Sequence, residues 1–162
     1  MRKYVALFSL LLIEPISART YSVPQDEPIA TIRIPESWQV RQGGEYIDAT
    51  TPDGAHVLVM PVEGTKVADS LGEAMRYIRR TGTVVVKADS MKRDTATVKE
   101  KQLQIVSWDA TDNDRAIRIR CHVVPVADGK QLLVIFWGSL EAETKYQREL
   151  NEIFETLQAA KE

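Results

Sequence analysis

LLVIFW, at residues 132–137, is a run of six apolar residues with no polar position between them. A strand with one solvent-exposed face alternates apolar and polar residues, so an unbroken apolar run predicts burial on both faces of a sheet. The predicted strand that contains it covers residues 131–138, and two more strands precede it, over residues 102–110 and 115–126. The connections are short and rich in turn residues, which predicts an antiparallel meander with a covering layer on each side.

A C-terminal helix, predicted over residues 139–160, supplies part of that cover. Its apolar stripe contains Ala142, Tyr146, Leu150, Ile153, Phe154 and Leu157. Ser139 is interpreted as the helix N-cap, because the Gly-x-Ser-x-Gly elbow of hydrolases is absent around it. A first, shorter helix is expected over residues 70–80, where Ser70 and Glu73 have the spacing of a capping box.

The N-terminal half of the chain has the pattern of strands. They are expected over residues 29–34, 45–51, 56–62 and 84–86. The second and third of these form a hairpin around Pro52-Asp53-Gly54-Ala55, because proline and Asp-Gly favour a tight turn. Residues 87–100 are polar and are interpreted as a surface segment with a strand fragment near 96–98.

Residues 1–18 have the pattern of a signal peptide. Arg2 and Lys3 precede an apolar run at residues 4–13, which is shorter than the about 20 apolar residues that span a bilayer. Cleavage is expected after Ala18; the alternatives are an uncleaved anchor or a buried N-terminal segment. No later run is long enough to span a membrane, so we expect a periplasmic or secreted protein without stable membrane insertion after signal cleavage.

The rest of the chain is predicted to be one domain. Residues 19–28 hold two prolines and no regular period, and are interpreted as a flexible lead to a domain over residues 29–162. The formal net charge of −2 makes nucleic-acid binding a poor interpretation, because phosphate neutralisation requires a concentrated basic surface. Cys121 is the only cysteine, which excludes an internal disulfide.

Motifs of catalysis and metal binding are absent from the sequence. Neither His56 nor His122 lies in a His-Glu-x-x-His pattern. Cys121 and His122 are adjacent in a predicted strand and point to opposite faces, which fits a buried thiol and a sheet-surface imidazole. The acids within residues 109–114 fail the EF-hand spacing and fit turn chemistry. We therefore predict no catalytic residue, no metal, no cofactor and no enzyme; a hydrolase with an unrecognised site is the less favoured alternative.

One strand of the predicted meander has a cationic face. Arg118, Arg120 and His122 alternate along it, and apolar residues occupy the positions between them. A row of this kind is suited to a carboxylate or phosphate group, with Gln102 or Gln104 of the neighbouring strand beside it. The alternative is that the face is solvated or paired with acids of a covering helix.

Trp38 and Trp108 complete the candidate binding residues. Tryptophan is enriched in interfaces and ligand pockets because it combines a large apolar surface with a hydrogen-bond donor. Core filling is the commoner reason for a tryptophan, so both interpretations stay open for these two residues.

Several short phrases resemble PsbP-like and DcrB-like domains. They are Ile-Pro-Glu-Ser-Trp at residues 34–38, the Asp-Gly hairpin after it, Ser-Leu-Gly-Glu-Ala-Met at residues 70–75, and the meander followed by a helix. The resemblance covers nearly all of the chain after residue 18, and it rests on element order. It implies an α+β fold, an α/β/α sandwich with a central, mostly antiparallel sheet, and an exported accessory role. It transfers no functional residue.

These observations favour an exported, non-catalytic accessory or binding domain that acts on an envelope protein complex. The alternative is a binder of a small anionic ligand, with Arg118, Arg120 and His122 lining its site. A ligand binder requires a concave pocket that contains the arginines, and a partner binder requires an exposed apolar patch. An enzyme requires a converging acid, base and nucleophile.

Overall fold

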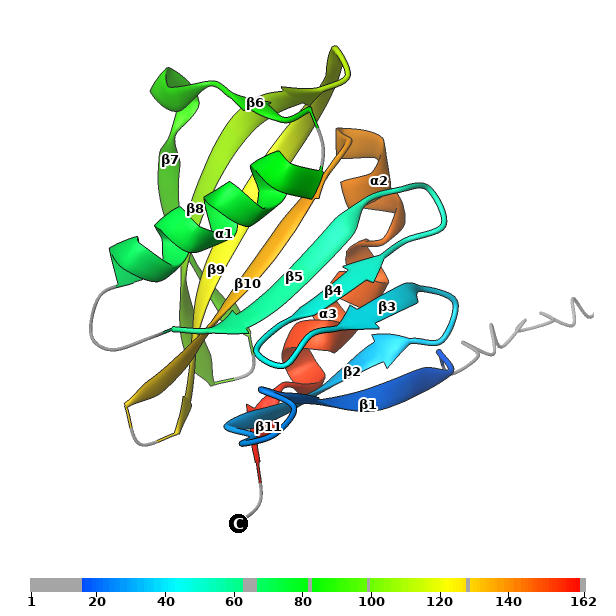
Figure 1. Cartoon of the computed structure of the whole chain (residues 1–162), viewed down its shortest axis with the longest axis vertical. Coiled ribbons are helices and arrows are strands. Elements are labelled where there is room, and N and C mark those ends of the chain that lie inside the picture. The colour runs from blue at the N-terminus through cyan, green and yellow to red at the C-terminus, as the bar shows by residue number, and fades with distance from the viewer. Residues whose placement is uncertain (1–15, 63–66, 82, 99, 128, 161–162) are drawn as a thin grey trace, which may run out of the picture.

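The computed structural model describes residues 16–62, 67–81, 83–98, 100–127 and 129–160, and its strands form two sheets (Figure 1). Every strand pair within these residues is antiparallel. The large sheet has the order β3 (Gln39–Gln42), β4 (Ile47–Thr50), β5 (His56–Pro61), β10 (Lys130–Gly138), β9 (Arg115–Ala127), β8 (Lys101–Asp112) and β6 (Val85–Val86), with β7 (Lys92–Val98) also paired to β8. The small sheet contains β1 (Ala18–Val23), β2 (Ala30–Pro35) and β11 (Gln158–Ala159).

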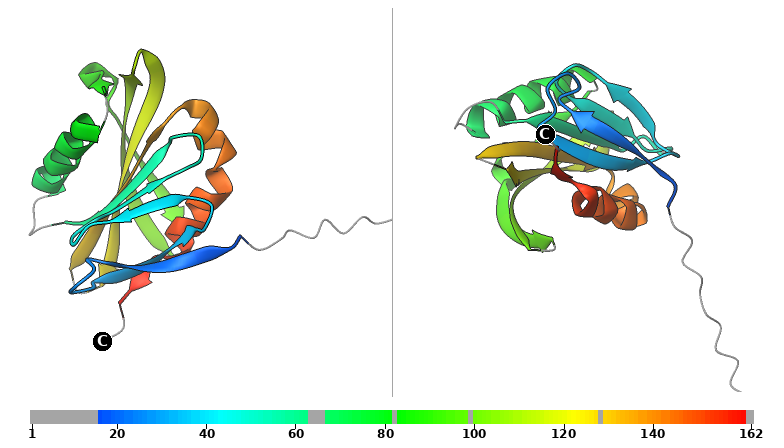
Figure 2. Two further views of the ribbon diagram at one scale, coloured as in Figure 1. Left: turned by 45° about the vertical axis from the view of Figure 1, so that its right-hand side comes forward. Right: turned by 90° about the horizontal axis from the view of Figure 1, so that it is seen from below.

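Helices cover both faces of the large sheet. α1 (Val67–Thr81) lies on one face, and α2 (Leu140–Lys145) and α3 (Gln147–Thr156) lie on the other, as Figures 1 and 2 show. A single 3₁₀ turn, η1 (Ala88–Ser90), connects β6 to β7. The predicted α+β sandwich with a central antiparallel sheet is therefore confirmed, and so is the meander, because β8, β9 and β10 are neighbours in chain order.

The apolar run in β10 is buried on both faces, as predicted. Leu132, Val134 and Phe136 belong to the core on the side of α2 and α3. The alternate residues, Leu133, Ile135 and Trp137, belong to the core on the side of α1. Since side chains alternate along a strand, one continuous apolar segment supports two separate cores.

The predicted flexible lead is wrong in its first half. β1 pairs with β2 along its whole length, from Ala18 opposite Pro35 to Val23 opposite Ala30, and Val23 is fully buried. Antiparallel pairing with β2, the next strand along the chain, supplies the order that the sequence of this segment does not indicate. Residues 1–15, which make up most of the predicted signal peptide, lie outside the described residues.

The C-terminal helix is shorter than predicted and is interrupted. Tyr146 leaves helical geometry, with φ −100° and ψ 15°. Its ring packs edge-on against Trp38 at 5.8 Å between centroids, and its hydroxyl donates to Asp53 Oδ2 at 3.1 Å. The helix ends at Thr156, because Leu157 is extended and the chain then adds β11 to β2.

α1 begins at Val67, so Ser70 lies inside the helix and is buried. The capping-box interpretation of Ser70 and Glu73 was therefore wrong. The N-cap interpretation of Ser139 is confirmed, because its Oγ accepts a hydrogen bond from the backbone N–H of Ala142 at 3.0 Å.

The polar segment at residues 87–100 contains a complete strand, where only a fragment near 96–98 was expected. β7 pairs with β8 from Lys92 opposite Ser107 to Val98 opposite Lys101. The first four residues of β7 are all exposed, so no alternation marks the strand in the sequence. The turns fit their predictions: Gly54 in the β4–β5 hairpin has φ +80°, and Asn113 and Asp114 between β8 and β9 have φ +47° and +63°.

Candidate functional site

The large sheet has a concave face on the side of α2 and α3. In the right-hand view of Figure 2, β7 and β8 curve out of the sheet on the same side as these helices. We call the hollow next to the helices the arginine groove. Its floor is Arg118, Arg120 and His122 of β9 with Phe136 of β10; its wall is formed by residues of α2 and α3, among them Glu143, Leu150 and Phe154.

The arginine groove has a volume of about 470 Å³. A second hollow, of about 370 Å³, adjoins it on the side of β7 and shares Arg118 and Arg120 with it. Lys92, Arg93 and Asp94 of β7 also line this second hollow. The two arginines therefore line both of these adjacent hollows.

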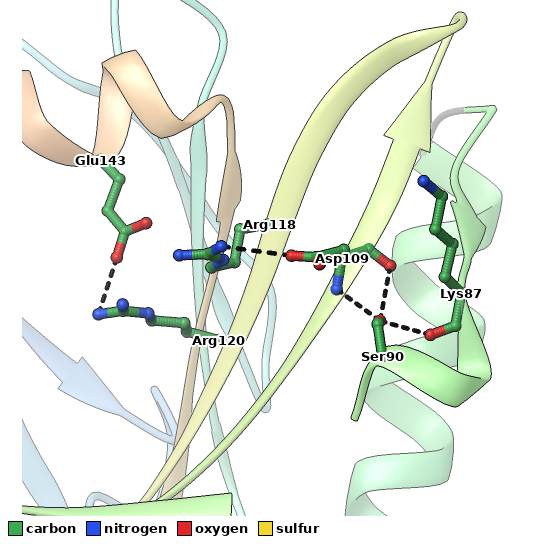
Figure 3. A network of polar contacts seen from close by, with 6 residues as sticks. All are labelled: Lys87, Ser90, Asp109, Arg118, Arg120 and Glu143. Carbon is green, nitrogen blue, oxygen red and sulfur yellow. Dashed lines mark hydrogen bonds and ion pairs between the residues drawn. The ribbon is translucent and has the colours of Figure 1, made fainter. Parts of the chain in front are cut away.

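Each arginine of the groove has a carboxylate partner within the chain. Figure 3 shows Arg120 directed toward α2, where its Nη1 lies 2.8 Å from Glu143 Oε1, and Arg118 directed toward β8, where its Nη2 lies 3.3 Å from Asp109 Oδ1. The arginine side chains remain 41% and 28% exposed, respectively. The predicted cationic face is thus partly paired with an acid of a covering helix and partly open to solvent.

The backbone of Asp109 is held by the 3₁₀ turn. Ser90 Oγ accepts from the Asp109 N–H at 2.9 Å and donates to the Lys87 carbonyl at 2.6 Å (Figure 3). The Lys87 N–H in turn donates to the Asp109 carbonyl at 3.0 Å. This clamp fixes the strand that carries the carboxylate partner of Arg118.

His122 is the inner end of the arginine groove. Its side chain is buried, where a sheet-surface imidazole was expected, and its ring lies 4.6 Å from that of Phe154. Burial lowers the pKa of His122 to about 4, so the ring is neutral at pH 7. Nδ1 lies 3.2 Å from the Val134 carbonyl and donates to it, which leaves Nε2 as a hydrogen-bond acceptor. The groove is therefore cationic at its mouth and neutral and aromatic at its base.

The structure separates the other candidates from this site. Gln104 pairs with Val123 and so shares the opposite face of the sheet; Gln102, two residues earlier, lies on that face too. Trp108 is among the residues that line the second hollow, but it also packs against the core on the side of α1. Trp38 is a core residue and lies outside the groove.

Cys121 faces away from His122, as predicted. It is buried in the core on the side of α1, and burial raises the pKa of its thiol to about 12. A thiol of this kind is protonated at pH 7 and is a poor nucleophile. Among the described residues, no group of three His, Cys, Asp or Glu side chains is placed to hold a metal ion.

A second polar cluster, on the α1 side, was missed by sequence reasoning. The buried carboxylate of Asp48 accepts a hydrogen bond from Tyr77 Oη at 2.8 Å and lies 3.1 Å from His56 Nδ1. Burial raises the pKa of Asp48, but the hydrogen bonds from His56 and Tyr77 outweigh it, and the net shift is downward. His56 stacks on Trp137 at 4.6 Å. These residues are far apart in sequence, so no local spacing indicated the cluster.

The fold and the groove define a class of small α+β sandwich domains with an antiparallel sheet and helices on both faces. No protein-family model and no curated protein matches the chain. Within the described residues, no helix has the length and apolar character that a membrane crossing requires.

Solved structures match the chain in fold. A protein from Bacteroides thetaiotaomicron VPI-5482 aligns over 88% of this chain with a TM-score of 0.58 and 13% identity; the chain spans 48% of that protein. LpqN of Mycobacterium tuberculosis, described as involved in cell envelope biogenesis, aligns over 89% of this chain and 92% of its own, with a TM-score of 0.53 and 13% identity. Cyanobacterial PsbP (CyanoP) from Synechocystis sp. PCC 6803 aligns over 91% and 95%, with a TM-score of 0.51 and 9% identity. The chain therefore has the PsbP-like/DcrB-like fold that its sequence phrases predicted.

Proposed function

We propose that this chain is an exported, non-catalytic accessory domain and that it binds the acidic part of its ligand in the arginine groove. Two observations support export. Residues 1–18 have the signal-peptide pattern, and the fold is shared with LpqN, a protein involved in cell envelope biogenesis.

The observation that carries the binding site is the concave groove that contains both arginines. A ligand carboxylate or phosphate can replace Glu143 or Asp109 as the partner of a guanidinium group, because a partly exposed ion pair contributes only about 0–1 kcal/mol. Arginine then offers two parallel N–H donors to the incoming anion. The aromatic base of the groove, at His122 and Phe154, accepts an apolar portion of the same ligand.

The distribution of apolar surface favours an anionic ligand over a broad apolar interface. Among the described residues, the large apolar side chains that are strongly exposed are Val85, Met91 and Leu140, which come from three different segments. A docking surface for a protein partner requires a contiguous apolar patch. A partner that uses this face is therefore expected to insert an acidic segment into the groove.

The test is a titration of the domain with glutarate and with inorganic phosphate, followed by ¹H–¹⁵N NMR of backbone amides and arginine Nε–H groups. We expect shifts at Arg118, Arg120 and Glu143, and an affinity at least about tenfold weaker in the Arg118→Gln/Arg120→Gln variant. The matched control is Arg115→Gln, an exposed arginine of the same strand outside the groove. An equal affinity of the double variant and the wild type for both anions would contradict the proposal.

A capture experiment separates a free ligand from a protein segment. The tagged domain is incubated with envelope extract, with the Arg118→Glu/Arg120→Glu variant and Arg115→Gln in parallel. Protein bands that are retained by Arg115→Gln and lost in the double variant indicate an acidic partner. A co-purifying small anion, detected by native mass spectrometry and absent from the double variant, indicates a small ligand.

A further inference from the structure

A second pocket lies on the opposite face of the large sheet, between α1, β5 and Tyr46, the residue before β4. We call it the tyrosine pocket. It has a volume of about 550 Å³ and is lined by Tyr46, Leu58, Met60, Glu73, Arg76, Tyr77 and Arg80. Leu58 is fully buried in the same core as Ala74 and Ile78 of α1, so the floor of the pocket is continuous with the hydrophobic core.

The walls of the tyrosine pocket are fixed without a ligand. The rings of Tyr46 and Tyr77 meet edge to face, with 5.1 Å between centroids and an interplanar angle of 61°. Tyr77 is anchored further, because its hydroxyl donates to the buried carboxylate of Asp48, which in turn lies against His56. Since these contacts hold the ring in place, binding to its face requires little loss of side-chain entropy.

The rim of the tyrosine pocket carries cations that are free to pair. Arg76 and Arg80 lie four residues apart on α1 and so share one face of the helix. Both are exposed, and no described carboxylate lies within ion-pair distance of either, in contrast to Arg118 and Arg120. Glu73 is the one acid in the lining, so the rim has an excess of positive charge.

We propose that the tyrosine pocket binds an anionic amphiphile. Its short apolar chain lies on Leu58 and Met60 beside the paired tyrosine rings, and its carboxylate or phosphate head is held by Arg76 and Arg80. Ligand sites combine an apolar lining with a few placed polar groups, and guanidinium pairs with both kinds of head group in a bidentate manner. This site is distinct from the arginine groove, which lies across the sheet, and its function does not depend on the groove.

The test uses decanoate, decyl phosphate and decanol, each below its aggregation concentration, in calorimetric titrations of the wild-type domain. We expect decanoate or decyl phosphate to bind at least about tenfold more tightly than decanol, which has the same chain without a charge. Whichever of the two anions binds more tightly identifies the head group. The proposal would be overturned if decanol bound as tightly as both anions. It would also be overturned if neither decanoate nor decyl phosphate bound. This comparison needs no variant.

Variants locate the bound molecule. Arg76→Gln/Arg80→Gln is expected to weaken binding of the anions about tenfold or more, whereas Arg79→Gln is expected to leave it unchanged, because Arg79 is exposed on the same helix outside the pocket. The Met60 methyl resonance is expected to shift on binding. If the affinity is lost instead in Arg118→Gln/Arg120→Gln, the molecule occupies the arginine groove; that result refutes the tyrosine pocket and leaves the proposed function standing.

Discussion

Asp48 stabilises the fold through buried hydrogen bonds. It is 1% exposed, and its two oxygens are occupied by Tyr77 and His56. Removing one member of a buried, hydrogen-bonded cluster costs more than the net value of the bonds, because the remaining polar groups stay buried without a partner or water. Asp48 therefore anchors α1, through Tyr77, to the β4 end of the sheet.

We expect Asp48→Ala to lower the free energy of unfolding by roughly 3 kcal/mol at pH 7, measured by urea denaturation. The folded pKa of Asp48 lies below its unfolded value of about 3.9. Its ionisation therefore stabilises the fold above that pH, and the contribution is lost as the pH falls through the folded pKa. The difference in stability between the wild type and Asp48→Asn should accordingly shrink between pH 7 and pH 3. Asp26→Asn, at an exposed carboxylate, should show no such trend.

At the level of single residues, the alternation of side chains along a strand predicts which residues of that strand share a face, but it does not predict which residues of the next strand lie beside them. Arg118, Arg120 and His122 were predicted to share a face, and they do, because side chains in a strand alternate with a period of two. The prediction for Gln102 and Gln104 was wrong, because the turn at residues 113–114 sets the register between β8 and β9. A shift of one residue moves a whole strand's side chains to the other face. Composition does not determine that register.

At the scale of elements, the strongest sequence signal came from β10 and from the turns around it. Its end is tightly packed as well: a Cβ on Gly138 would lie 2.6 Å from the Cβ of Ala55, in the tip of the β4–β5 hairpin. The chain then leaves the sheet directly into α2, with Ser139 as its N-cap. Gly138 therefore leaves room for Ala55, and the next residue, Ser139, caps the helix that follows.

Ser139→Ala is expected to lower the free energy of unfolding by about 1 kcal/mol, because the N–H of Ala142 loses its partner. Chemical denaturation measures the change. Ser139→Asp, which also caps a helix N-terminus, should retain the stability of the wild type. A loss of equal size in both variants would mean that the serine acts through packing and not as a cap.

Other elements were not predictable from local patterns. β7 has a polar, mostly exposed sequence. It forms a strand because it pairs with β8 over seven residues. The interruption at Tyr146 lies inside a good helical stripe, and it is held by contacts with Trp38 and Asp53, which belong to the N-terminal half of the chain. Long-range contacts outweigh helix propensity in such places.

At the scale of the whole molecule, the large sheet separates two environments. The face toward α2 and α3 carries the arginine groove, and the face toward α1 carries the tyrosine pocket and the Asp48 cluster. The sandwich and the arginine row followed from the sequence. The tyrosine pocket did not, because its lining comes from α1, β5 and the residue before β4, which meet only in the folded chain.

The predicted cleavage site, after Ala18, lies at the first residue of β1, so cleavage must be compatible with the pairing of β1 and β2. Cleavage after Ala18 would leave residues 19–23 paired with β2 and would remove the contacts of Ser17 with Glu36, which are exposed. The mature domain, residues 19–162, is therefore expected to have the same melting temperature as a chain that keeps Ser17 and Ala18.

Expression of the whole chain in a bacterial host should yield a periplasmic protein whose intact mass corresponds to residues 19–162. Signal peptidase requires a small residue before the cut, so Ala18→Phe should leave the precursor uncleaved and membrane-associated. A full-length product of the wild type in the cytoplasm would contradict export. Binding in the arginine groove would survive that result, because the groove is lined by residues of β9, β10, α2 and α3 and by none of residues 1–18.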